Sequence, residues 1–382
     1  MLQKIKREAS DQPSSVMTQK TMIKPRFTFC IPNLNKIKYL PACIESVLAQ
    51  DCEDWCCVFV DGYSTDGSWE YMQQFASDTR FMLRRGIRQG MYADWNECLK
   101  YVDTEYFYFL TSDDTCFQRL VSTTTTVLDI YPDIKACHFK FNLINSIGET
   151  IKFHEEIVKD EFPLYHDVNK CMHQRSGTFE FFMHLLYGTI YRTITSLVLR
   201  KTILSVLKNF SSIYGSIGDY DWTMRLGLFT DIIFIPECLA TWRIYEGQAT
   251  QGLNSSLHKK RTLEIAKKNT DLFIQNQELY ITEPFRSKQG ILSNYYDDYA
   301  RCLLEEFFVA KAVDESAIRL YAFLANSPIY LFKKIINRLS QGRFYQYRGD
   351  KRKFALDLVD RYGLAWPPVP LHSESKKSNL EI

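Results

Sequence analysis

The sequence predicts an α/β fold: a Rossmann-like, mostly parallel central sheet flanked by helices, followed by a helical C-terminal extension. Strand-like and helix-like segments alternate between residues 25 and 115, which is typical of βαβ units and parallel sheets. One segment, Tyr106–Leu110, is an unbroken aromatic and aliphatic run, as expected of a strand buried on both faces. The 382 residues are enough for one large domain with an extension, or for two domains.

Four strands and three helices are expected in this first part. The strands are short apolar runs, and the helices carry apolar residues at helical spacing. In chain order the expected elements are strand Phe27–Ile31, helix Ile37–Gln50, strand Trp55–Val60, helix Ser68–Ala76, strand Phe81–Arg84, helix Tyr92–Tyr101 and strand Tyr106–Leu110. Together they have the outline of a nucleotide-binding half, which we expect over residues 25–115.

The composition excludes some classes of protein. The 47 basic and 45 acidic residues give a net charge of +2, so the overall charge does not indicate nucleic acid, and no such partner is expected. The 11 cysteines form no C-x-x-C pair and no zinc-type spacing, which favours buried free thiols in a reducing compartment.

Residues 1–24 are expected to be a flexible tail and lack the apolar run of a signal peptide. No segment reaches the ~18 apolar residues of a membrane-spanning helix, so we expect a cytoplasmic protein.

Polar residues follow the expected strands, at the edge where open α/β sheets bind ligands. They are Asn35, which follows Pro32 after the first strand, Asp61 and Asp66 after the second, Thr111, Asp113 and Asp114 after the fourth, and Asp219 and Asp221 much later. Carboxylates in such a place offer hard oxygen ligands to Mg²⁺ or Mn²⁺. The alternative is a helix cap, in which Ser112 or Asp113 only begins the next helix. The chain has no glycine-rich phosphate loop, so a bound phosphate would need a metal ion or basic side chains.

A series of short motifs follows along the chain in a fixed order. The first strand leads into Ile31–Asn35, the next helix ends in Ser46–Gln50, and the second strand leads into Val60–Gly67. The later motifs are Gly90–Asn96, Thr111–Asp113, Gly218–Leu226, Pro236-Glu237 and Trp242-Arg243. The series resembles the family 2 glycosyltransferases, which have the GT-A fold, and the likeness spans about residues 25–250. The resemblance makes residues 116–250 an acceptor half, in which Phe179–Tyr191 is expected to be a core helix, or else the wall of an acceptor groove.

The resemblance implies the following roles. The residues that it places around a nucleotide-sugar donor are Pro32, Asn35, Asp61, Asn96, Thr111 and Arg243. Pro32 and Asp61 would hold the base, expected to be uracil, Asn35 would shape the first loop, and Arg243 would lie near the phosphates. Asp113 would bind the Mn²⁺ or Mg²⁺ ion that bridges the diphosphate. Asp219 would deprotonate an acceptor hydroxyl, which implies a single displacement with inversion.

Three positions depart from the family pattern. The first acid of the Asp-x-Asp site is Thr111, the usual Glu before the base is Gly218, and a frequent histidine is Tyr245. Processive members carry a Gln-x-x-Arg-Trp motif and membrane helices; neither occurs here, which favours transfer of one sugar.

The resemblance therefore implies an inverting, metal-dependent glycosyltransferase that uses a nucleotide-sugar, expected to be a UDP-sugar, and a glycan or lipid-linked acceptor in cell-surface polysaccharide assembly. A nucleotidyltransferase is disfavoured, because the first loop is neither glycine-rich nor basic. A non-catalytic nucleotide-sugar-binding or scaffolding protein with a degraded metal site stays open.

Some acidic residues have a structural alternative. Asp66 and Asp94 are expected to be loop and cap residues, Asp221 to be a carboxylate at a helix start, and Arg225 to pair with one of the acids.

The C-terminal extension, residues 251–382, contains a basic segment and is expected to end in a loose tail after Pro367. Between residues 330 and 353, eight basic residues alternate with apolar ones, and Asp350 is the only acid. Such a segment could be an amphipathic helix in peripheral contact with an anionic membrane, on its inner face, or a solvated helix packed on the domain.

Overall fold

A computed structural model describes residues 24–248, 255–276 and 351–371, together with isolated positions between 292 and 323. The expected N-terminal tail and most of the basic segment 330–353 lie outside the described residues. In the described part of the chain, no helix is long and apolar enough to cross a membrane.

The first half of the sheet is parallel, as the sequence predicts. Its strands are β1 (Phe27–Asn33), β2 (Trp55–Asp61), β3 (Phe81–Arg85) and β4 (Tyr106–Phe109). They lie in the order β3-β2-β1-β4, and all three neighbouring pairs are parallel. The connecting helices are α1 (Leu40–Leu48), α2 (Ser68–Gln73) and α3 (Met91–Lys100).

Both faces of these strands are buried, which explains their continuous apolar sequences. In β4, Phe107 and Phe109 pack into a core that includes Trp95 of α3, whereas Tyr106 and Tyr108 pack into the core on the α1 side. Alternate residues of one strand therefore belong to different cores, as the pleat of a strand requires.

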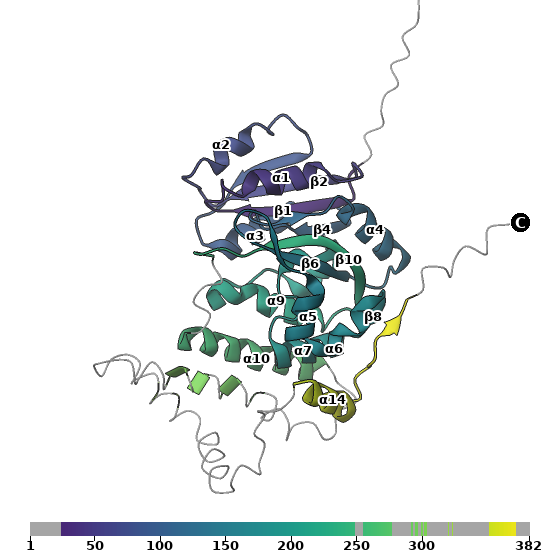
Figure 1. The fold of residues 1–382 in the computed structure, drawn as a ribbon. Helices are drawn as coiled ribbons and strands as arrows, with labels where there is room; N and C mark the ends of the chain where they lie inside the picture. The colour runs from purple at the N-terminus through teal and green to yellow at the C-terminus, as the bar shows by residue number, and fades with distance from the viewer. Residues whose placement is uncertain are drawn as a thin grey trace, which may run out of the picture.

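The second half makes the sheet mixed. It contains β5 (Thr115–Cys116), β6 (Ala136–Ile144), β7 (Thr150–Lys152), β8 (His173–Arg175), β9 (Leu197–Arg200), β10 (Ile232–Arg243) and β11 (Val369–Pro370). β9 joins this half to β4 by antiparallel pairing, while β6 and β10 pair in parallel. In Figure 1 the sheet continues from β1 and β4 at the top through β6 and β10 to β8. The predicted α/β class is confirmed, with antiparallel strands added in the second half.

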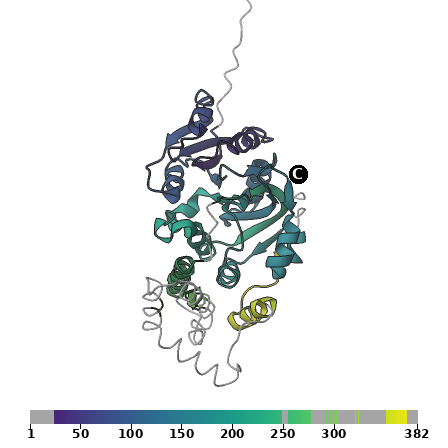
Figure 2. The ribbon, with the colours of Figure 1, turned by 60° about the vertical axis from the view of Figure 1, so that its left-hand side comes forward.

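Helices cover and extend this second half. They are α4 (Leu120–Ile130), α5 (His154–Glu161), α6 (Pro163–His166), α7 (Gly177–Tyr187), α8 (Leu204–Leu207), α9 (Gly218–Leu226), α10 (Ser256–Asn276) and α14 (Lys351–Tyr362). Figure 2 shows the first half in purple above the second half in teal, with α10 and α14 below both. The expected core helix is confirmed as α7, in which Phe179, Phe181 and Met183 are fully buried.

The segment after Pro367 differs from the loose tail that the sequence predicts. Val369 and Pro370 pair with β8, and the Leu371 amide donates a hydrogen bond of 2.9 Å to the Met172 carbonyl. The Trp366 ring stacks on Phe179 at 4.6 Å. The sequence prediction missed this because the segment is short and proline-rich and its partners lie about two hundred residues earlier. Residues 372–382 are outside the described part.

Candidate functional site

The carboxyl ends of β1 and β2 form one side of the candidate site. Asp61 ends β2 directly opposite Asn33 of β1, and its carboxylate is buried. Asn33 Nδ2 donates to Asp61 Oδ1 at 2.9 Å, while the Ser64 amide and Arg85 Nη1 donate to Oδ2 at 2.9 and 2.6 Å. Pro32 lies in β1 beside this pair and is buried.

The loops after these strands are tied to each other. Asn35 has a φ of +53°, its amide donates to Ser64 Oγ at 2.8 Å, and its Oδ1 accepts from the Thr65 amide at 2.8 Å. Asp66 accepts from the Ile37 amide at 2.9 Å and from Ser68, which confirms it as a loop residue. The predicted loop-shaping residue Asn35 is therefore a link between the two loops.

The end of β4 contains the two adjacent acids, which have different surroundings. Asp114 is buried, and its carboxylate accepts from the Arg243 amide at 2.7 Å, from Thr111 Oγ1 at 2.6 Å and from Thr195 Oγ1 at 2.9 Å. Burial, and then the neighbouring Asp113, raise the pKa of Asp114 to about 7. Asp114 thus links the end of β4 to β10, and Thr111 turns its hydroxyl inward to this acid.

Asp113 is the acid that faces the site. Its Oδ2 accepts a 2.6 Å hydrogen bond from the Tyr245 hydroxyl and lies 3.4 Å from Lys36 Nζ, which also contacts that hydroxyl. Burial, followed by the charge of Asp113, holds the pKa of Tyr245 above its usual value, so the phenol stays protonated and donates. The sequence prediction named neither Lys36 nor Tyr245 as a site residue, although Lys36 directly follows Asn35.

Arg243 lies behind this acid and is committed to the backbone. Its Nε donates to the Asp113 carbonyl at 2.7 Å and its Nη1 to the Asn145 carbonyl at 2.9 Å. The guanidinium also lies over the Tyr39 ring, 4.8 Å from its centre. The side chain therefore holds the loop after β4 and is engaged by backbone carbonyls.

Asp219 lies in the first turn of α9 and comes from the second half. Tyr92 of α3 donates a 2.8 Å hydrogen bond to Asp219 Oδ1, so one helix of each half positions this carboxylate. Burial raises the pKa of Asp219 above its ordinary value. The carboxylate is therefore more basic than an exposed aspartate, which suits proton abstraction.

Asn96, predicted to contact the donor, and Asp221, expected at a helix start, both bind other parts of the chain. Asn96 donates to the Phe210 carbonyl at 2.9 Å and accepts from the Phe210 amide at 2.8 Å. Its amide group therefore holds the segment before α9, and the structure does not bring it to the acids. Asp221 is fully buried with Arg225 at 3.2 Å and Asn269 at 3.1 Å, which confirms the expected ion pair with Arg225.

Asp94 is held next to Asp61. It lies in the first turn of α3, and a Cβ on Gly86 would come within 2.0 Å of its Oδ1. Burial, and then the charges of Asp61 and Glu97, raise the pKa of Asp94 to about 6. Asp94 therefore lies at a helix start, as the sequence predicts.

Residues 28–139 match the family model described as Glycosyl transferase family 2. Over this segment the chain is similar to the family 2 glycosyltransferases. Among curated relatives, it is 34% identical over 99 residues to a PGL/p-HBAD biosynthesis glycosyltransferase of Mycobacterium bovis, covering 25% of this chain and 39% of the relative. It is 26% identical over 108 residues to the putative glycosyltransferase EpsE of Bacillus subtilis, covering 28% and 39%. The alignments thus span about two fifths of the length of these relatives.

Solved structures have the same fold over most of the chain. Residues 1–349 of S. aureus TarS give a TM-score of 0.56 at 16% sequence identity, covering 90% of this chain and 93% of that one. The complex of the same TarS fragment with UDP-GlcNAc gives 0.53 at 15%, again covering 90% and 93%. These likenesses establish the GT-A fold of this chain.

The structure explains one departure from the family pattern. A Cβ on Gly218 would lie 2.4 Å from the Ser211 carbonyl oxygen and 2.7 Å from Tyr92 Cε2. The family's glutamate cannot fit here without moving Tyr92, the side chain that holds Asp219. In this chain the glycine is therefore required by close packing beside Asp219.

Gly218→Ala should lower the free energy of unfolding by about 1–3 kcal/mol, because the methyl group overpacks the contact with Ser211 and Tyr92. Chemical denaturation measures the change. Ser216→Ala, at an exposed position of the same segment, is the matched control and should stay within about 0.5 kcal/mol of wild type. Equal stability of the two variants would contradict the prediction and show that the segment around Ser211 moves to make room for the methyl group.

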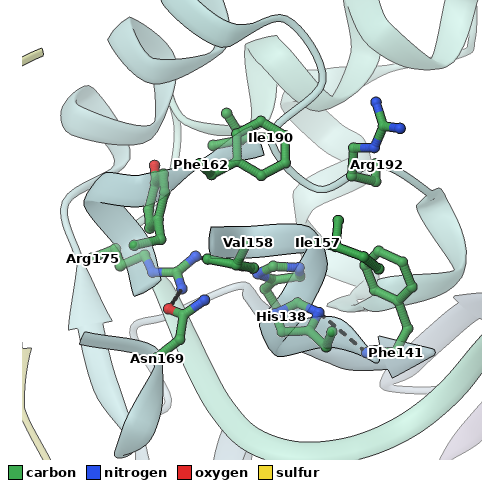
Figure 3. Close-up of a pocket in the computed structure, with 11 residues that line it drawn as sticks. His138, Phe141, Ile157, Val158, Phe162, Asn169, Arg175, Ile190 and Arg192 are labelled. Atoms are coloured by element: carbon green, nitrogen blue, oxygen red, sulfur yellow. Dashed lines mark hydrogen bonds between the residues drawn. The ribbon is translucent and has the colours of Figure 1, made fainter. Parts of the chain in front are cut away.

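A separate buried pocket lies between β6, β8 and the helices α5 and α6 (Figure 3). On one side of it Arg175, which is 2% exposed, donates to Asn169 Oδ1 and to His173 Nε2. His138 and His154 line the same pocket and are nearly fully buried. The pocket is lined by none of the predicted donor or catalytic residues, and its lining mixes polar and apolar side chains.

Proposed function

We propose that this protein transfers one sugar from a nucleotide-sugar, expected to be a UDP-sugar, to a hydroxyl group of a glycan or lipid-linked acceptor, with inversion at the anomeric carbon. The observation that carries the proposal is the half-buried Asp219 carboxylate, held by Tyr92 and made more basic by burial, in a family 2 chain whose strand ends carry Asp61 and Asp113. The complexes of TarS with UDP-GlcNAc and with UDP, in the same fold, support the choice of donor.

Asp61 and Asn33 supply acceptors for the base of the donor. An ionised carboxylate offers about four lone-pair sites, and three donors already occupy sites on Asp61. Asn33 Oδ1 is buried and has no hydrogen-bond partner among the described residues. A buried acceptor of this kind calls for a donor from outside the chain. The N–H group of uracil is a suitable one.

Asp219 performs the proton transfer. A sugar hydroxyl is a weak acid, and its attack on the anomeric carbon is assisted by a base within about 3 Å of its proton. Asp219 accepts that proton as the oxygen forms its bond to the anomeric carbon, while the bond to the nucleoside diphosphate breaks on the opposite side. Tyr92 keeps the carboxylate oriented through its hydrogen bond to Oδ1.

The Mn²⁺ or Mg²⁺ ion predicted at Asp113 fits these residues poorly, although members of family 2 often use divalent metals. Asp114 is buried and already accepts from three donors, one of which is the Thr111 hydroxyl. Tyr245 and Lys36 already contact Asp113 Oδ2. In the described part of the chain, no group of three His, Cys, Asp or Glu side chains could hold a metal ion. We assign no step of the reaction to a metal.

Release of nucleoside diphosphate from a panel of UDP-, GDP- and dTDP-sugars tests the proposed function. One UDP-sugar should be hydrolysed slowly by the wild-type protein, and addition of the correct acceptor should accelerate release. Hydrolysis of a GDP- or dTDP-sugar instead would correct the base. Binding of a nucleotide-sugar without any turnover would favour the non-catalytic binding protein.

The proposed location is the cytoplasm, with peripheral contact to an anionic membrane through segment 330–353. Neutralising the eight basic residues of that segment should weaken binding to anionic vesicles if the proposal holds. Unchanged vesicle binding would count against it.

A further inference from the structure

Lys36 places a positive charge at the acid predicted to bind the metal. Its Nζ lies 3.4 Å from Asp113 Oδ2 and 4.7 Å from the centre of the Tyr245 ring, and it contacts the Tyr245 hydroxyl. The ammonium group thus has an ion-pair partner, a hydrogen-bond partner and an aromatic face, which come from the ends of β4 and β10. The lysine side chain is still 25% exposed, so it can reach a ligand in the site.

The loop that carries Lys36 is held by hydrogen bonds to the segment after β2. The Lys36 amide donates to Ser68 Oγ at 3.2 Å, the neighbouring Asn35 amide to Ser64 Oγ at 2.8 Å, and the Ile37 amide to Asp66 Oδ2 at 2.9 Å. Three consecutive amides therefore hold the backbone against the loop after β2, and the start of the lysine side chain cannot drift away from Asp113.

The Tyr245 side of the contact is fixed as well. The Tyr245 ring packs on the buried Tyr39 ring at 4.7 Å, and the Arg243 guanidinium lies over Tyr39 at 4.8 Å. Arg243 itself is bound to the Asp113 and Asn145 carbonyls and cannot turn to a phosphate without releasing them. Lys36 therefore lies beside Asp113 and, unlike Arg243, can turn to a phosphate without breaking hydrogen bonds from its side chain to the backbone.

A diphosphate that approaches Asp113 meets a carboxylate of its own charge. The Lys36 ammonium compensates that charge and offers N–H donors to phosphate oxygens, an interaction in which both partners are ionised. This is the compensation that a bridging metal supplies elsewhere. Resting on the proposed function, we propose that Lys36 is the cation of the donor site: it binds the diphosphate of the nucleotide-sugar and makes donor binding independent of a divalent metal.

Nucleoside diphosphate binding, measured by titration calorimetry with EDTA and with Mn²⁺, tests this proposal without requiring turnover. The probe is UDP, or GDP or dTDP if UDP does not bind. Wild type should bind with the same affinity, within about twofold, in both conditions. Lys36→Met should weaken binding in EDTA about 30-fold or more, because a phosphate loses its charged partner. Mn²⁺ should recover part of this loss, because Asp113 is then open to the metal.

Two further variants separate this role from folding and from general charge. Lys36→Arg keeps the charge and should bind in EDTA within about tenfold of wild type. Lys38→Met removes an exposed positive charge two residues away and should change the affinity less than about threefold.

Two results would overturn the proposal while leaving the proposed function intact: wild-type binding that is lost in EDTA and restored by Mn²⁺, or Lys36→Met binding in EDTA as well as wild type. If none of the three diphosphates binds wild type in either condition, the proposed function and the role of Lys36 both fail.

Discussion

Asp219→Asn should reduce kcat by about 10²–10⁴-fold, the range that a general base contributes. Asparagine has the same shape, and its Oδ1 can still accept from the Tyr92 hydroxyl, so the geometry at the start of α9 is kept. What is lost is the ability to take the proton of the acceptor. Steady-state release of nucleoside diphosphate gives kcat, and UDP affinity, which should be unchanged, is the control. A variant that keeps more than a tenth of wild-type kcat would show that the base lies elsewhere.

The pH dependence of the same reaction checks the role of Tyr92. Burial raises the pKa of Asp219, and the weaker effect of the Tyr92 hydrogen bond lowers that pKa. In Tyr92→Phe the pKa should therefore rise further, and the acid limb of the kcat/KM profile should move to higher pH. A limb that stays in place, or moves to lower pH, would separate Tyr92 from the catalytic carboxylate.

The buried histidines should make the protein sensitive to acid. Burial lowers the pKa values of His154, His173 and His184 to about 3, from 6.5. Each side chain is therefore neutral in the folded protein but takes up a proton on unfolding below pH 6.5. The stability that depends on the neutral form is present above that pH and is lost as the pH falls toward 3. Linkage gives about 2 kcal/mol for each histidine between pH 7 and pH 5.

His184→Asn isolates one of these contributions. Asp94 and Asp114, whose pKa values are raised to about 6 and about 7, act in the opposite direction over the same range, so a difference between proteins is needed. The asparagine amide can replace His184 Nδ1 as the donor to the Gly188 carbonyl, 3.1 Å away. Between pH 7 and pH 5 the variant should lose about 2 kcal/mol less unfolding free energy than wild type. Equal losses in chemical denaturation would contradict the prediction, and the difference at pH 8 measures the packing cost alone.

The first half of the fold could be predicted because its pattern is local. β1 and β4 are buried on both faces, so each is a continuous apolar run, and the elements connecting them are short. The second half could not be predicted in the same way. β6 carries His138, Lys140 and Asn142 among its apolar residues, and β8 is a strand only because β10 and β11 pair with it. Such pairing between distant segments leaves little trace in a local sequence pattern.

In the candidate site, too, some features could be predicted from the sequence and others could not. The positions of Asp61 and Asp113 at strand ends follow from the order of the elements. The sequence does not indicate that Asp114 is the buried acid of the pair, because that depends on the Arg243 amide and the Thr195 hydroxyl. It also does not indicate the contact of Lys36 with Asp113 and Tyr245, which joins three loops far apart in the chain. The two hydrogen bonds of Asn96 to the Phe210 backbone also join distant segments, so the sequence does not indicate them.

The pairing of Val369–Pro370 with β8 has a consequence for solubility. β11 lies at the end of the sheet and covers β8; without this cover the backbone N–H and C=O groups of β8 would face solvent and could pair with a strand of another molecule. The proline at this position leaves the outer segment with one donor fewer, which makes it a poor template for a further strand. The last described residues therefore protect the sheet against edge-to-edge aggregation, and shortening the chain before Trp366 would remove that protection together with the ring that covers Phe179.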